Sequence, residues 1–194
     1  GIAAATMTGL GAGPAMLTVT PGTVDFGAVA TGSSSLPAFF TVANAGAASG
    51  PLDLALTGAD ATHFAILPGG SCIDGSTILA VGSACTVLID FAPTISGAKS
   101  AALAVNAAPG GTATATLTGS GLAPAQLTIT PAAKSFGTVP IDGTSAPITF
   151  TVTNAGAVTT GPINLTLAGA DAGEFAFYAP GGTCVSGVTA LNGG

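Results

Sequence analysis

The 194-residue chain has very little positive charge. Lys99 and Lys134 are its only basic residues besides one histidine, and with eight acidic residues the net charge is −6 at neutral pH. Proteins that bind nucleic acids use cationic side chains to displace the counterions of the phosphates, and basic clusters bind anionic lipid surfaces for a related reason. We therefore expect no nucleic-acid partner and no recruitment to an anionic membrane surface.

The chain also lacks tryptophan, long apolar runs and clusters of metal-binding side chains. No stretch of 18 or more apolar residues is present, so we expect no direct membrane insertion. His63 is the only histidine, whereas a zinc site needs about four Cys or His ligands, so no metal and no other cofactor is expected. No Ser/His/Asp set or phosphate loop stands in a recognisable context. The prediction is that the chain is not an enzyme.

Apolar, small and turn-forming residues make up most of the remainder. Hydrophobic residues reach 48%, with 30 glycines and 13 prolines, whereas charged residues reach only 5%. This composition favours strands joined by turns. About seven strands within about 110 residues is typical of an immunoglobulin-like sandwich. Alternating apolar residues predict the strands at 16–21, 39–46, 52–58, 63–66, 85–93, 100–108 and 112–121.

The sequence contains the same segments twice. The matching pairs are LTVTPGTVDFGAV (17–29) with LTITPAAKSFGTV (127–139), FTVANAG (40–46) with FTVTNAG (150–156), and GPLDLALTGADATHFAI (50–66) with GPINLTLAGADAGEFAF (161–177). Internal repeats of this kind indicate copies of one structural unit. We predict an all-β protein of tandem immunoglobulin-like β-sandwich modules, seven-stranded, of which the second is incomplete.

The repeat also predicts the boundaries of the modules. AAATMTGLGAGPAM near the start resembles ATATLTGSGLAPAQ (113–126), so residues 1–16 are interpreted as the last strand of a preceding module or a donor strand. A complete module then covers 17–126, and the N-terminal two-thirds of a second module covers 127–194. Three explanations fit this register: the sequence is part of a longer chain, it is a proteolytic or cloned fragment, or strands pair between copies. If copies polymerise, the predicted assembly junction comprises Gly1, Ile2, Met7, Met16, Cys184 and Gly194.

Three cysteines and two aspartates are the candidate structural sites. Cys72 and Cys85 are 13 positions apart, and together with the one histidine they are too few ligands for a zinc site. We therefore predict a disulfide between them, which places the protein in an oxidising compartment. Cys184 matches Cys72 and is predicted to be an unpaired thiol or one whose partner lies outside this sequence. Asp60 and Asp171, in the repeated GAD, are predicted to cap short helical turns by accepting backbone N–H bonds.

Both copies resemble the choice-of-anchor D repeat, which is related to the ASH and Hydin modules. The resemblance is carried by F..V..G......FTV.NAG, then L.GAD...F, then GG.C..G..L..G..C.V.I.FAP...G..SA.L. It covers essentially the whole chain, and the Cys…Cys-Thr-Val…Phe-Ala-Pro segment is its most specific part. The resemblance implies tandem sandwiches of large secreted or surface-attached bacterial proteins, with structural or adhesive roles. Cys184, without a partner, departs from the pattern.

These observations lead to one main hypothesis and two alternatives. The main hypothesis is a non-catalytic, extracellular or cell-surface bacterial protein that forms a stalk, sheath or filament, with strand complementation between subunits. Its partners would be copies of itself or adjacent repeats of the same chain. One alternative is an adhesin that holds a surface glycan or protein ligand on loops such as 67–84, with Tyr178 the candidate aromatic contact. The other is a set of spacer repeats of a secreted enzyme whose catalytic domain lies outside this sequence.

Overall fold

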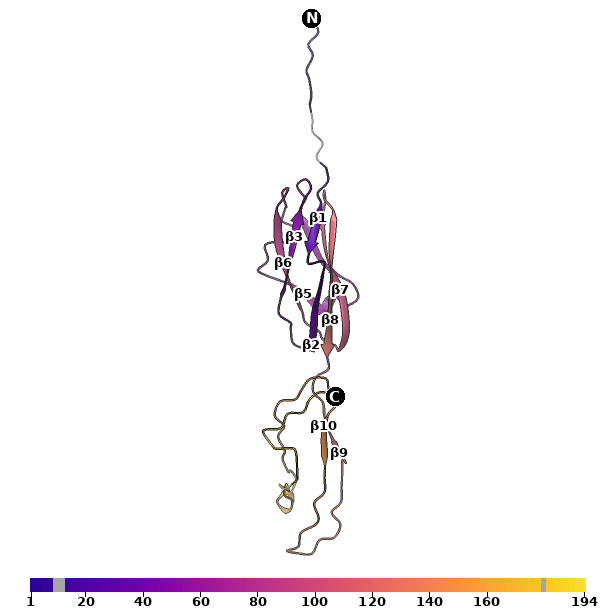
Figure 1. Ribbon diagram of the computed structural model, residues 1–194, viewed down its shortest axis with the longest axis vertical. Helices are drawn as coiled ribbons and strands as arrows, with labels where there is room; N and C mark the ends of the chain where they lie inside the picture. The colour runs from indigo at the N-terminus through magenta and orange to yellow at the C-terminus, as the bar shows by residue number, and fades with distance from the viewer. Residues whose placement is uncertain (9–12, 179–180) are drawn as a thin grey trace. The chain divides into compact units, whose positions relative to one another are not determined.

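The computed structural model describes residues 1–8, 13–178 and 181–194 (Figure 1). The chain forms two compact units, Gly1–Gly121 and Leu122–Gly194. Within the described residues, strands and loops make up both units, each with one short 3-10 turn. None of the described helices is long and apolar enough to cross a membrane. The predicted all-β class is confirmed.

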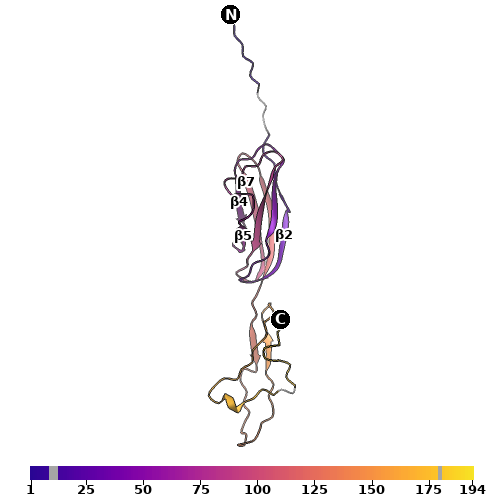
Figure 2. The same ribbon diagram turned by 90° about the vertical axis from the view of Figure 1, so that its left-hand side faces the viewer.

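The first unit is a sandwich of two four-stranded sheets. One sheet has the order β1-β3-β6-β5, and the other has the order β2-β8-β7-β4. Figure 2 shows β2 and β4 at opposite margins of this unit, as the strand order requires. The strands are β1 (Leu17–Thr20), β2 (Thr23–Ala30), β3 (Ala38–Asn44), β4 (Leu52–Thr57), β5 (Phe64–Leu67), β6 (Ala84–Phe91), β7 (Gly97–Ala107) and β8 (Thr112–Leu122).

Alternation of side chains along the strands builds the core between the two sheets. In β6, Cys85, Val87, Ile89 and Phe91 are buried, while the residues between them are exposed or partly exposed. Successive side chains of a strand point to opposite faces of its sheet, so one face of β6 is apolar throughout. The same pattern is present in β3, which pairs with β6, and in β7 of the other sheet. The sandwich predicted from this alternation is confirmed.

The structure has one strand that the sequence analysis did not predict. β2 follows β1 after only Pro21 and Gly22, and it belongs to the other sheet. Proline cannot donate a ladder hydrogen bond, so the first strand ends there and the chain continues on the opposite layer. Gly27 in β2 has a positive φ of 71°, a conformation that favours glycine. These interruptions weaken the alternation of apolar residues within 23–30, which is why the sequence did not predict β2. The unit has eight strands instead of the predicted seven.

Three phenylalanine rings fill one end of the first core. The ring centroid of Phe64 lies 4.9 Å from that of Phe91 and 5.7 Å from that of Phe26. A Cβ atom at Gly119 in β8 would lie 2.7 Å from Cε1 of Phe91. Because this is inside van der Waals contact, a glycine in β8 is required for the ring to pack against that strand.

One buried asparagine joins three separate segments at the start of the first sandwich. Oδ1 of Asn44 accepts hydrogen bonds from the N–H groups of Met16, at 2.9 Å, and Gly46, at 3.0 Å. Its Nδ2 donates to the carbonyl oxygens of Ala47, at 2.7 Å, and Leu79, at 2.9 Å. We call this arrangement the asparagine clamp. It fixes the segment that enters the module against the turn after β3 and the loop before β6.

The asparagine clamp is present again in the second unit. Oδ1 of Asn154 accepts from the N–H groups of Gln126, at 2.9 Å, and Gly156, at 3.0 Å. Its Nδ2 donates to the carbonyl oxygens of Val158 and Leu191. A Cβ atom at Gly156 would overlap the backbone of the entering segment, as it would at Gly46 in the first unit. The repeated Asn-Ala-Gly motif is therefore required by this contact.

The rest of the second unit is less regular. β9 (Leu127–Thr130) pairs antiparallel with β10 (Thr151–Asn154), in the same register as β1 with β3. A 3-10 turn, η2 (Ala172–Glu174), matches η1 (Ala61–His63) of the first unit. Phe136 and Phe175 have centroids 5.6 Å apart at 56°, close to the 5.7 Å and 58° of Phe26 with Phe64. The second unit thus keeps the same framework.

The alternation of β3 can be tested with two neighbouring phenylalanines. Phe40 is 0% exposed and Phe39 is 66% exposed. Phe40→Ala should lower the free energy of unfolding of the first unit by about 3–5 kcal/mol, because it leaves a cavity in the core. Phe39→Ala should change it by less than about 1 kcal/mol. Hydrogen exchange of the β6 amides, resolved by mass spectrometry, reports this unit alone, and equal losses in the two variants would contradict the assigned faces.

The asparagine clamp predicts a loss of stability upon removal of its amide. Asn44→Ala leaves the N–H groups of Met16 and Gly46 and the Ala47 carbonyl without this partner, whereas the Leu79 carbonyl still accepts from the Ser49 N–H. Buried unsatisfied groups cost about 1–3 kcal/mol each. Allowing for partial hydration, we expect a loss of about 2–4 kcal/mol in the same exchange measurement. Asn106→Ala, in β7, is the matched control, since the Asn106 side chain makes only an exposed 3.4 Å contact with Asp53. A loss no greater than that of the control would show that the clamp is dispensable.

Candidate functional site

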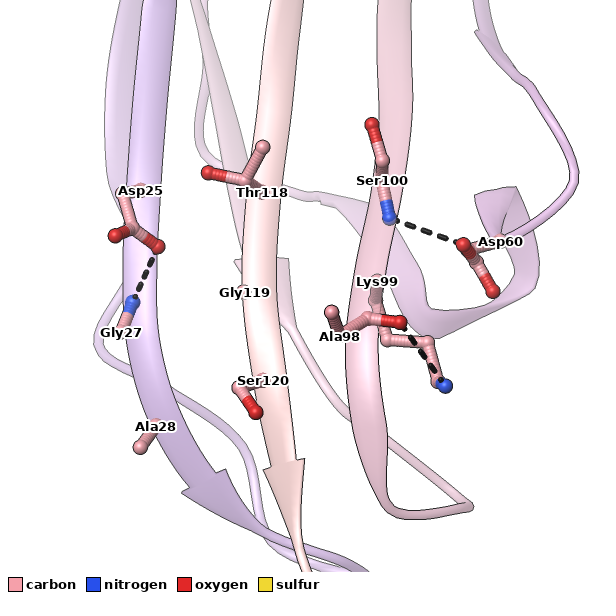
Figure 3. A pocket seen from close by; sticks show the side chains of 10 residues that line it. All are labelled: Asp25, Gly27, Ala28, Asp60, Ala98, Lys99, Ser100, Thr118, Gly119 and Ser120. Atoms are coloured by element: carbon pink, nitrogen blue, oxygen red, sulfur yellow. Dashed lines mark hydrogen bonds between the residues drawn. The ribbon is translucent and has the colours of Figure 1, made fainter.

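A shallow pocket of about 560 Å³ lies along β2, β8 and β7, and Asp25, Asp60 and Lys99 are among its lining residues. Figure 3 shows Asp25 on one side of this pocket and Asp60 on the other. Oδ1 of Asp25 accepts from the Gly27 N–H at 3.0 Å, and Oδ2 of Asp60 accepts from the Ser100 N–H at 3.0 Å. Both carboxylates are therefore already bonded to backbone groups.

The lysine of this pocket is also bonded to backbone atoms. Lys99 is only 7% exposed, and its Nζ donates to the carbonyl oxygens of Ser96, at 3.2 Å, and Ala98, at 3.4 Å. A buried ammonium group needs such acceptors to offset its lost hydration. The bonds of Asp25 and Lys99 are thus local to β2 and to the start of β7, whereas the Asp60 bond joins the η1 turn to β7.

The prediction that the two aspartates cap short helical turns with their side chains is wrong. Asp60 and Asp171 do occupy the positions before η1 and η2, but neither side chain makes a capping hydrogen bond. An N-cap residue usually has extended backbone angles, whereas Asp60 has φ −103° and ψ 15° and Asp171 has φ −105° and ψ 23°. Asp60 instead accepts from Ser100, so it ties the turn to β7.

The predicted disulfide between Cys72 and Cys85 is confirmed. The two Cα atoms are 5.1 Å apart, and the bond joins the loop after β5 to β6. Beside it, the Cys72 N–H donates to the Thr86 carbonyl at 2.9 Å, and the Thr86 N–H donates to Ser71 Oγ at 2.9 Å. The loop therefore forms a short extra edge along β6. A disulfide in this position is typical of proteins that fold in an oxidising compartment.

His63 and the acidic residues do not assemble a metal site in the described parts of the chain. Nδ1 of His63 lies 3.3 Å from both the N–H and the Oγ1 of Thr94, which fixes the loop after β6. Across residues 1–8, 13–178 and 181–194, no group of three or more His, Cys, Asp or Glu side chains could hold a metal ion.

The second unit contains a larger groove of about 1170 Å³. It lies between the segment 147–152, the segment 164–167 and the loop 181–186, and its lining residues include Phe150, Tyr178 and Cys184. Within the described residues, Cys184 is a free cysteine and is partly buried. The groove carries no acidic or basic side chain among its lining residues. Its lining is therefore uncharged and combines apolar side chains, hydroxyl groups and one thiol.

The remaining predicted junction residues lie in solvent or in irregular segments. Ile2 and Met7 are fully or almost fully exposed, and Met16 is exposed beside β1. Gly194 donates its N–H to the Gly156 carbonyl at 3.1 Å, within the second unit. Cys184 lines the groove of the second unit.

Sequence reasoning missed the asparagine clamp and the groove. The clamp had a signal, because Asn-Ala-Gly occurs at the same place in both copies. The groove left a weaker signal in the sequence, because the segments that form it are far apart along the chain.

No family model matches the chain, and no curated protein matches it. Solved structures do share its backbone arrangement in part. A family 123 glycoside hydrolase from Clostridium perfringens is 9% identical with a TM-score of 0.43, over 57% of this chain and 27% of that one. The chain therefore matches about a quarter of the length of that enzyme.

Two further solved structures are matched over more than two thirds of their own length. The ASH/PapD-like domain 7 of human CEP192 is 17% identical with a TM-score of 0.35, over 62% of this chain and 94% of that one. The class 5 fimbriae chaperone CfaA is 10% identical with a TM-score of 0.39, over 77% and 71%. The two packed four-stranded sheets of the first unit define the class, an immunoglobulin-like β-sandwich module. Such a module is compatible with a structural or a binding role.

The disulfide predicts a measurable contribution to the stability of the first unit. The Cys72→Ser/Cys85→Ser double variant should lose about 3 kcal/mol in free energy of unfolding, as expected when a loop of about 15 residues is no longer closed. Hydrogen exchange of β3 and β6 amides measures this loss. Cys184→Ser, which removes a thiol that closes no loop within the described residues, is the control and should leave these amides unchanged. Equal protection in both variants would refute a stabilising role for the disulfide.

Proposed function

We propose that this chain is a non-catalytic, load-bearing repeat of an extracellular or cell-surface bacterial structure such as a stalk, sheath or filament. The observation that carries the proposal is the direction of β2 and β8. These strands are hydrogen-bonded neighbours, and Figure 3 shows that they run the same way, Asp25 to Ala28 beside Thr118 to Ser120. They lie near the entrance and the exit of the first module, respectively.

Tension along the chain therefore loads this sheet in shear. A force that pulls the start of β2 and the end of β8 in opposite directions acts along both strands, so their hydrogen bonds share the load. An antiparallel hairpin pulled from its open end instead loses its bonds one at a time. Each net hydrogen bond contributes only about 0.5–1.5 kcal/mol, so simultaneous loading is what gives a sandwich mechanical resistance.

Three further features support the same function. The asparagine clamp ties the entering segment to the body of each unit through backbone N–H groups. The disulfide closes a loop that would otherwise lengthen under force. The sequence pattern resembles the choice-of-anchor D repeat of secreted or surface-attached proteins, and a disulfide favours an oxidising compartment.

A binding function has one specific observation in its favour. The loop between β5 and β6 exposes Ile73, Ile78 and Val81, three large apolar side chains on one disulfide-closed segment. Exposed apolar groups that lie together are typical of protein-interaction surfaces. An adhesin that uses this loop is therefore the second candidate function.

The mechanical proposal predicts an anisotropic resistance to force. In single-molecule pulling of the full chain, handles at Gly13 and Leu122 should unfold the first unit at a higher force than handles at Gly97 and Leu122, which open the β7–β8 hairpin from the end where Gly97 pairs with Gly121. Reduction of the disulfide should add about 40 Å to the released length, from roughly 3.6 Å per extended residue over the locked loop. An equal or lower force in the first geometry would refute the load-bearing role.

A further inference from the structure

The outer face of the sheet β1-β3-β6-β5 carries a row of large apolar side chains in the first unit. Phe39 of β3 pairs opposite Leu88 of β6, and Leu88 pairs opposite Leu67 of β5. Phe39 and Leu88 alternate with buried residues of their strands, and cross-strand partners share one face of a sheet. The three side chains therefore point away from the core, and we call them the outer row.

The second copy of the repeat shows that the outer row is not a general requirement of the fold. The alignment of FTVANAG with FTVTNAG places Thr149 where the first unit has Phe39, and Ala146 where it has Leu36. Phe39 is 66% exposed and Leu36 is 88% exposed. Exposed apolar groups that lie together are typical of interaction surfaces. The outer row is thus a feature of the first unit that its core does not explain.

One acidic side chain adjoins the outer row. Asp90 is two positions after Leu88 in β6, which puts it on the same face at a distance of roughly 7 Å along the strand, opposite Ala65 of β5. The residue is partly exposed, but its Oδ1 is buried and has no hydrogen-bond partner, the one such side-chain atom in the described residues. A carboxylate oxygen without a donor is complementary to the N–H groups of a cationic side chain.

The first unit has no accessible lysine or arginine to pair with this carboxylate. Lys99 is its only one, and that side chain is buried and bonded to backbone carbonyls. A second copy of the unit would therefore bring mainly negative charge to Asp90. A partner with an arginine fits better, because a guanidinium group binds a carboxylate through two hydrogen bonds and also stacks on aromatic rings.

We propose that the outer row and Asp90 form a docking surface for an apolar segment of a different protein that carries a basic side chain, of which arginine fits best. An apolar side chain of the segment packs against Phe39 and Leu88, and the basic group bonds to Asp90. The contact excludes water from the ion pair and so strengthens it. This inference goes beyond the load-bearing role, because it gives the repeat a surface that holds a second protein.

The test uses the full chain and a displayed library of random peptides as the probe. Peptides are selected on the wild-type chain, and the recovered sequences are synthesised for affinity measurements. We expect them to combine large apolar residues with an arginine or lysine. They should bind Phe39→Thr at least about tenfold more weakly, because that variant lacks the aromatic anchor of the interface. Hydrogen exchange of the β6 amides confirms that the variant is folded.

An apolar control comes from the other exposed surface of the first unit. Ile78 is 59% exposed in the loop between β5 and β6, and its counterpart in the second copy is Ala190. Ile78→Ala should leave the affinity of the recovered peptides unchanged. If their affinity fell with Ile78→Ala and not with Phe39→Thr, the loop would be the binding surface and the proposal would be overturned.

Asp90→Asn tests the ion pair separately, because it removes the charge and keeps the shape of the side chain. We expect the basic peptides to bind this variant at least about fivefold more weakly, through faster dissociation. Raising the salt from about 0.1 M to 1 M shortens the Debye length from about 10 Å to 3 Å, and it should weaken binding to the wild type more than binding to Asp90→Asn. Asp53→Asn, which introduces the residue of the second copy at Asn164, is the charge-matched control and should bind as the wild type does.

The remaining outcomes would overturn the proposal. Recovered peptides without basic residues, or none above background, would show that the surface does not hold a basic apolar segment. Dimerisation of the wild type that Phe39→Thr abolishes would assign the outer row to a second copy of this chain. None of these measurements loads the β2–β8 hydrogen bonds, so a failure of docking and a failure of the load-bearing role are separate results.

Discussion

The fold depends on one side-chain amide in each unit. Asn44 and Asn154 each use both the oxygen and the nitrogen of the carboxamide to join the segment that enters the unit, the turn that follows a strand and a distant loop. These segments are 28 to 37 positions apart in the sequence. A buried polar network of this kind favours a unique arrangement only if every member is satisfied. The paired sheets, the disulfide and the groove all lie on the framework that it sets.

Local patterns predicted most of the first unit and little of the second. Alternation at Cys85–Phe91 predicted a strand because both faces of that strand are well defined, one against the core and one toward solvent. β2 was missed because Pro21, Gly22 and Gly27 interrupt its pattern. The capping role of Asp60 was wrong because the backbone angles before η1 turn its carboxylate toward β7. Neither the clamp nor the groove could be derived from alternation, since both depend on contacts between distant segments.

The two units share the same entering segment, the same aromatic pair and the same asparagine clamp. In the first, β6 supplies the buried row that closes the sandwich, and the Cys72 loop is bonded to it. In the second, the same entering segment, the same aromatic pair and the same asparagine clamp persist without that row among the described residues. The clamp and the aromatic pair are therefore local features that both copies of the repeat share.

The burial of Lys99 has a consequence for behaviour in solution. The first unit contains five aspartates, Asp25, Asp53, Asp60, Asp74 and Asp90, and Lys99 is its only lysine or arginine. Because that ammonium is covered and bonded to backbone carbonyls, the side-chain charge facing water is almost wholly negative. Such surfaces repel one another over roughly a Debye length, about 10 Å at 0.1 M salt. The ionic strength, and divalent cations above all, would therefore govern how closely these units approach side by side.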